Sequence, residues 1–147
     1  FDVTRAVRAA VPAHLTVSAK VRLGFSDKSL YLEIAQAAEE AGASWLTVHA
    51  RTRDEGYRPP AHWEYTSRMR EELKIPVIAN GEVWTVADYW KCREVTGCQH
   101  VMIGRGLIAE PLLASVIKSS LAARASVATR ASVATRGPFA AISATGR

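Results

Sequence analysis

The segment HVMIGRG, residues 100–106, passes directly from a short apolar run into a glycine-rich turn. The run His100–Ile103 is long enough for a short buried strand, and the following glycines mark its end. Glycine lets a backbone approach a ligand closely, and Arg105 adds a positive charge beside it. The segment therefore raises the question of which fold places a strand and such a turn in this order.

Three further apolar segments precede this one at similar intervals. They are TVSAKVRL (16–23), WLTVHA (45–50) and IPVIAN (75–80), and the centres of successive segments are 24 to 30 residues apart. Each has the length and the branched apolar residues of a buried strand. The sequence therefore predicts four strands at a regular period.

Helical patterns fill the intervals between these strands. Gly42 and Gly97 are placed to end two of the predicted helices, and Thr85-x-x-Asp88 resembles a capping box. Glu110-Pro111 has the composition of a helix start. The predicted helices lie after Asp27, across residues 65–73, across residues 86–96 and after Pro111.

Strands that alternate with helices at this period predict an α/β fold with a parallel sheet. The strands are apolar throughout, so we expect both faces of the sheet to be covered. Two architectures fit: an open doubly wound sheet, or part of a (β/α)₈ barrel. A full barrel needs about 250 residues, and four strands amount to half of one.

Residues 1–118 form the predicted globular part, and residues 119–147 differ from it in composition. The hexapeptide ASVATR occurs twice, at 125–130 and 131–136, and predicts a low-complexity tail that is disordered or marginally helical. This tail supplies four arginines and no acid, whereas residues 1–118 carry 15 basic and 14 acidic groups. The net charge of +5 therefore does not by itself indicate a nucleic-acid-binding surface.

Several classes of protein are disfavoured by the sequence. It has no apolar run of about 18 residues that would predict a membrane span. Cys92 and Cys98 form no CxxC motif and have no histidine cluster beside them, which disfavours a metal site and suits a cytoplasmic protein. The chain begins without Met, inside a helical pattern, so we expect it to be a piece of a longer protein.

Polar residues stand at the carboxyl end of each predicted strand, where parallel α/β folds bind ligands. Any one of them has an ordinary structural interpretation, such as a solvated lysine, a core histidine or a turn asparagine. Together they predict a site for an anionic ligand, with a phosphate at the glycine turn. A lysine beside an electron-rich ring would also stabilise negative charge on a reduced flavin. The strand ends are Lys20-Val21-Arg22, His49-Ala50-Arg51, Asn80-Gly81-Glu82 and Gly104-Arg105-Gly106.

The motifs KVRLG, VHARTRDEGY, PVIANGE and VMIGRG resemble those of the tRNA-dihydrouridine synthases, most closely the bacterial type that acts on uridine 16. The resemblance covers residues 1–118 and implies strands five to eight of an FMN-dependent TIM barrel. In this family NADPH reduces FMN, reduced FMN passes hydride to a uracil flipped out of tRNA, and a cysteine donates the proton. The implied partner is therefore tRNA.

The resemblance also implies roles for individual residues. Arg51 and Tyr57 match a loop over the active site and are expected to meet tRNA or cofactor, while Ala50 replaces a usual glycine. The expected FMN contacts are Lys20 at the pyrimidine end, His49, Asn80, Glu82 on the ribityl or phosphate side, and Gly104 and Arg105 at the phosphate.

The family's catalytic cysteine lies in a GCP segment that this sequence lacks, so the sequence assigns no catalytic residue to the chain. We therefore expect the chain to be inactive alone, and either poorly stable or paired with a second copy, since a half-barrel leaves two open sheet edges. Two alternatives stay open: another FMN barrel oxidoreductase of the dihydroorotate dehydrogenase type, and a non-catalytic fragment that binds phosphate or FMN.

Overall fold

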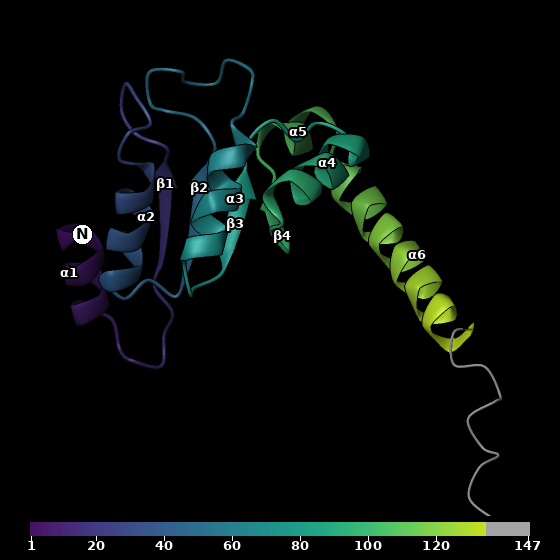
Figure 1. Ribbon diagram of the computed structural model, residues 1–147, viewed down its shortest axis with the longest axis horizontal. Helices are drawn as coiled ribbons and strands as arrows, with labels where there is room; N and C mark the ends of the chain where they lie inside the picture. The colour runs from purple at the N-terminus through teal and green to yellow at the C-terminus, as the bar shows by residue number, and fades with distance from the viewer. Residues whose placement is uncertain (135–147) are drawn as a thin grey trace, which may run out of the picture. The chain divides into compact units, whose positions relative to one another are not determined.

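A computed structural model of the protein describes residues 1–134, which contain one four-stranded sheet (Figure 1). All neighbouring strands are parallel, as the alternation of strands and helices predicted. The strands are β1 (Ser18–Arg22), β2 (Trp45–His49), β3 (Val77–Asn80) and β4 (His100–Met102).

The order of the strands decides between the two architectures that fit the sequence. Strands that are consecutive in the chain are neighbours in the sheet, in the order β1-β2-β3-β4. A doubly wound sheet reverses its order at a switch point, whereas a (β/α) barrel adds each strand beside the previous one. The predicted parallel (β/α) half-barrel is therefore confirmed.

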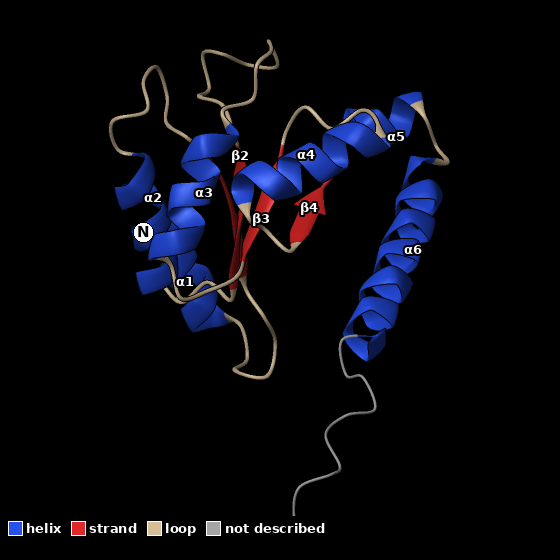
Figure 2. Cartoon of the chain, turned by 45° about the vertical axis from the view of Figure 1, so that its right-hand side comes forward, coloured by secondary structure: helices blue, strands red, loops and turns tan. Residues whose placement is uncertain are grey.

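The helices connect the strands and pack against them. Helix α2 contacts β1 and β2, α3 contacts β3, and α4 contacts β3 and β4 (Figure 2). The predicted capping box is present, since the Asp88 backbone N–H donates to Thr85 Oγ1 at 3.1 Å and the Thr85 N–H donates to Asp88 Oδ2 at 2.9 Å. Gly97 ends α4 in the left-handed conformation at φ 65°. The helices are α1 (Asp2–Ala10), α2 (Tyr31–Glu40), α3 (Trp63–Glu72), α4 (Val86–Thr96), α5 (Arg105–Ala109) and α6 (Leu113–Ala134).

The two faces of the sheet have different surroundings. Leu46, Val48 and Ala79 are fully buried on one face. On the other face Asn80 is half-buried and Met102 is 40% exposed, so the described residues cover this face only in part. The prediction of two covered faces was therefore wrong for the residues that the structure describes. An apolar run shows that a strand suits burial, but not which residues lie opposite it.

The chain divides into a compact unit, Phe1–Leu113, and a second unit that follows it. Residues 119–134 continue helix α6, where the sequence predicted a disordered or marginally helical tail. Alanine and arginine have high intrinsic helix propensity, which favours a helix without an apolar stripe. The rest of the predicted tail, residues 135–147, lies outside the described residues.

Candidate functional site

A cleft of about 570 Å³ opens at the carboxyl edge of the sheet. Every strand of the sheet contributes to it, as expected for parallel strands whose ends meet at one edge. Tyr57, predicted from the loop after β2, also lines it. The structure brings all six residues predicted to contact a cofactor into its lining: Lys20, His49, Asn80, Glu82, Gly104 and Arg105.

The strand register explains why these residues meet. Arg22 pairs with His49, His49 pairs with Asn80, and Asn80 pairs with Met102, so these four residues form one row across the sheet. Lys20 lies two residues before Arg22 and therefore points to the same face. The Asn80 side-chain amide donates to the Met102 carbonyl at 2.8 Å, which fixes the last strand against its neighbour.

His49 is a neutral imidazole in a positively charged environment. Burial lowers its pKa to about 4, and the nearby positive charges of Arg22 and Lys20, followed by Arg51 and Arg105, add to this effect. Arg51 Nη1 lies 3.4 Å from His49 Nε2. Because a guanidinium can only donate, Nε2 accepts and the ring proton lies on Nδ1. His49 can therefore offer an N–H donor without adding positive charge.

The depressed pKa of His49 predicts a pH-dependent stability. Between its ordinary value of 6.5 and its folded value of about 4, the unfolded chain binds a proton that the folded chain does not. The free energy of unfolding should therefore fall as the pH drops from about 7 to 5. Urea unfolding measured across this pH range should show the decrease in the free energy of unfolding in the wild type and in the control His14→Gln, whose histidine is exposed. Equal slopes in the wild type and in His49→Gln would contradict the assignment.

The loop after β3 is held in an unusual backbone conformation. Gly81 has φ 124° and Glu82 has φ 57°, a left-handed value that is uncommon outside glycine. Trp63 Nε1 donates to the Gly81 carbonyl at 3.0 Å, and Trp84 Nε1 donates to Glu82 Oε1 at 2.9 Å. Contacts from both sides therefore keep the Glu82 carboxylate at the cleft.

Arg51 lies behind the cleft rather than in it. Arg51 is fully buried. Its guanidinium donates to the Pro60 carbonyl at 3.2 Å and forms an ion pair with Glu82. It does not line the cleft, so the structure does not place it where a substrate would make contact. Its position instead supports Glu82 and His49, two residues that do line the cleft.

The two glycines of the last turn have different surroundings. A side chain at Gly106 would place its Cβ 2.2 Å from the Val83 carbonyl oxygen, so this glycine is required by the approach of two backbones. A Cβ at Gly104 would meet no atom within 4 Å. The backbone at Gly104 is thus open to the cleft, which fits the approach of a phosphate oxygen.

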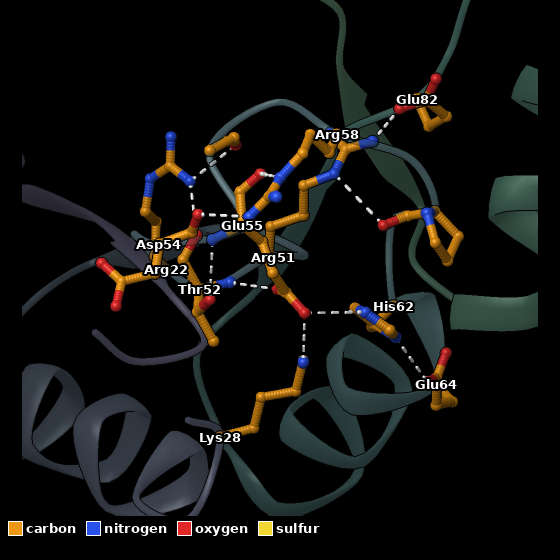
Figure 3. A network of polar contacts seen from close by, with 12 residues as sticks. Arg22, Lys28, Arg51, Thr52, Asp54, Glu55, Arg58, His62, Glu64 and Glu82 are labelled. Atoms are coloured by element: carbon orange, nitrogen blue, oxygen red, sulfur yellow. Dashed lines mark hydrogen bonds and ion pairs between the residues drawn. The ribbon is translucent and has the colours of Figure 1, made fainter. Parts of the chain in front are cut away.

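The segment 50–62 is anchored by polar contacts (Figure 3). Glu55 accepts from Lys28 Nζ at 2.5 Å and from the Thr52 N–H at 2.7 Å. Burial would raise the pKa of the Glu55 carboxyl, but these bonds and the Lys28 and His62 charges lower it to about 2. Arg22 also donates to the carbonyls of Thr52 and Gly56 at 2.8 and 2.9 Å. These contacts hold Tyr57 at the cleft.

The sequence placed Arg22 at one of the strand ends that predict the site but gave it no contact of its own, and it assigned no site role to Trp63 or Glu55, although each of the three shapes the site. The contribution of Arg22 could have been predicted in full, because it lies two residues from Lys20 on a strand and so shares its face. Trp63 and Glu55 carry no such signal, since their contacts are made with loops whose paths the sequence does not give.

The cysteines lie outside the cleft lining. Both thiols are free and buried, and burial, followed by the neighbouring Cys98, raises the pKa of Cys92 to about 12. Within residues 1–134, no cluster of three or more His, Cys, Asp or Glu side chains is arranged to hold a metal ion. In the same residues, no helix combines the length and apolarity needed to cross a membrane.

Comparison with known proteins gives a consistent family. The family model described as dihydrouridine synthase matches residues 1–140. The chain is 58% identical over 116 residues to the tRNA-dihydrouridine(16) synthase of Cupriavidus necator, covering 79% of this chain and 36% of that protein. The corresponding protein of Shewanella oneidensis is 56% identical over 118 residues, covering 80% and 38%. The chain spans little more than a third of the length of these relatives.

A solved structure shares the fold. It is described as the crystal structure of the Amycolatopsis orientalis BexX/CysO complex, and it matches 97% of this chain and 52% of its own with a TM-score of 0.61 at 23% identity. That similarity concerns the fold alone. The motif resemblance found in the sequence is confirmed by the family match, and the chain belongs to the dihydrouridine synthase family.

Proposed function

We propose that the chain forms the flavin-binding part of a tRNA-dihydrouridine synthase. This enzyme would reduce uridine in tRNA, at position 16 as the names of the relatives suggest, to 5,6-dihydrouridine. FMN would be its cofactor and NADPH its reductant. The observation that most supports this proposal is the convergence of four strand ends on one cleft with an excess of positive charge.

The residues of the cleft fit the parts of FMN. Gly104 and Arg105 would hold the phosphate, because an open backbone and a guanidinium are both suited to its oxygens. The neutral His49 and the Asn80 amide would hydrogen-bond along the cofactor, and Glu82 would face the hydroxyl groups of its ribityl chain. When bound, FMN would carry hydride from NADPH to the uracil ring.

Lys20 would lie at the pyrimidine end of the flavin. Burial, followed by the charge of Arg22, lowers the pKa of its ammonium. A cation at this position would stabilise negative charge that develops on the ring. Neither Cys92 nor Cys98 is assigned the role of proton donor, because neither lines the cleft. The free, buried thiols suit a reducing compartment, and we place the protein in the cytoplasm.

The proposal is tested by titrating the purified chain with FMN while recording flavin absorbance and fluorescence. Saturable binding, with weaker binding of riboflavin, is the expected result. The chain is then incubated with FMN, NADPH and tRNA that lacks dihydrouridine, and the modified base is quantified by mass spectrometry. Binding without product supports the cofactor site, whereas the absence of flavin binding would overturn the proposal. Reduction of orotate to dihydroorotate, with no reduction of tRNA, would favour the other flavin barrel enzymes.

Lys20→Ala is expected to make the reduction potential of bound FMN more negative. It should also slow uridine reduction by about 100-fold in a flavin-loaded synthase that contains this segment. The physical reason is the loss of a cation beside developing negative charge. Lys91→Ala, on the exposed side of α4, is the control and should change neither quantity. An unchanged potential and an unchanged rate in Lys20→Ala would contradict the role given to this lysine.

A further inference from the structure

Arg105 lies between two aromatic rings at the edge of the cleft. Its guanidinium carbon is 4.6 Å from the centre of the Tyr57 ring and 4.9 Å from the centre of a Trp84 ring. Tyr57 belongs to the segment after β2, whereas Trp84 belongs to the loop between β3 and α4. Both rings also line the cleft. Two separate parts of the chain therefore converge on one arginine.

The guanidinium of Arg105 has no acidic partner among residues 1–134. Glu82, the carboxylate in the cleft lining, accepts instead from Arg51 and from Trp84. A carboxylate partner would occupy the N–H edges of a guanidinium, whereas an aromatic ring contacts its flat face. Arg105 is thus held in place while its hydrogen-bond donors stay free for another anion.

Each ring is itself fixed by contacts away from Arg105. The Trp84 indole donates to Glu82 at 2.9 Å, which ties it to the strained loop. Tyr57 lies next to Gly56, whose carbonyl accepts from Arg22, and the Arg22 guanidinium carbon is 5.5 Å from the Tyr57 ring centre. The rings are therefore positioned by the protein before any ligand binds, although Tyr57 is 61% and Trp84 36% exposed.

We propose that Tyr57 and Trp84 are positioning residues for a phosphate group, which act by holding Arg105 with its donors directed at the anion. The sequence suggested contact with tRNA or cofactor for Tyr57, and this inference gives it a defined action instead. The inference rests on the proposed function only where it identifies the ligand as FMN. The contact that the two rings prepare is between Arg105 and a phosphate group.

The test compares FMN with riboflavin, which differ by the phosphate group, in ring-removing and ring-keeping variants. Trp84→Leu and Tyr57→Leu should each weaken FMN binding about two- to fivefold, as expected for an exposed cation–π contact. Riboflavin binding should change by less than about twofold. Trp84→Phe and Tyr57→Phe keep a ring and should retain most of the FMN affinity. Because Trp84→Phe also loses the bond to Glu82, it separates the ring from that bond.

Two controls separate positioning from a general structural effect. Phe25→Leu removes a ring 4.7 Å from the Arg53 guanidinium, outside the cleft lining, and should leave both ligands unaffected. In an Arg105→Ala background, Trp84→Leu should weaken FMN binding no further, because the residue that it positions is gone. The inference would be overturned if Trp84→Leu weakened FMN binding equally in both backgrounds, or if it weakened riboflavin binding as much as FMN binding.

Inorganic phosphate distinguishes this inference from the proposed function. If the wild type binds neither flavin, the proposed cofactor is wrong, and phosphate is titrated instead while backbone NMR signals of residues 104–106 are followed. Weaker phosphate binding in Trp84→Leu and Tyr57→Leu than in the wild type supports the positioning role. Equal binding in all three proteins, or no phosphate binding in the wild type, overturns it.

Discussion

Arg51→Ala is expected to lower the free energy of unfolding by about 3 kcal/mol, because it breaks an ion pair whose cation is completely buried. The substitution removes donors to the Pro60 carbonyl, the His49 ring and the Glu82 carboxylate at once. It also leaves Glu82 with one remaining side-chain donor, Trp84, in a left-handed backbone conformation. Chemical unfolding followed by circular dichroism measures this loss.

The matched control is Arg68→Ala, which removes an exposed arginine from helix α3. It should change the stability by less than about 0.5 kcal/mol. Glu82→Gln should cost less than Arg51→Ala, because the amide oxygen still accepts from the guanidinium. A stability of Arg51→Ala equal to that of Arg68→Ala would show that the buried ion pair contributes nothing to the fold.

Gly106→Ala is expected to destabilise the chain by about 2–3 kcal/mol. The new Cβ would lie 2.2 Å from the Val83 carbonyl oxygen, and backbone atoms cannot give way as a flexible side chain can. The turn and the loop that precedes α4 must therefore move apart. Because both line the cleft, FMN binding should fall together with stability.

Gly104→Ala, in the same turn, is expected to weaken FMN binding without lowering the stability of the chain. Its Cβ meets no protein atom within 4 Å, so stability should change by less than about 0.5 kcal/mol. FMN binding should nevertheless weaken, since the methyl group would occupy the space proposed for a phosphate oxygen. Thermal unfolding and a flavin titration on both variants are sufficient. If Gly104→Ala binds FMN as the wild type does, the phosphate does not approach this residue.

The fold could be predicted from the sequence because its signals are local. The Thr85–Asp88 capping box begins α4 and Gly97 ends it, and each strand lies within one of the predicted strand segments. The regular alternation of these strands with helices then predicted that the strands form a parallel sheet. The meeting of the six predicted residues at one cleft was predictable for a related reason. Five of them end or follow a strand, Lys20 lies two residues before the end of β1, and the carboxyl ends of parallel strands meet at one edge.

The sequence by itself thus determined the strands, the helices that connect them and the edge of the sheet at which the predicted site residues meet. Only the tertiary structure decided the contacts of the individual side chains, because these depend on partners far apart in the chain. Arg51 follows a strand, as other predicted site residues do. Its side chain nevertheless lies behind the cleft, where it forms an ion pair with the Glu82 carboxylate 31 residues away. Gly104 and Gly106 look equivalent in the sequence, yet only Gly106 meets the Val83 backbone. Such contacts follow from the path of the loops, which local sequence patterns do not encode.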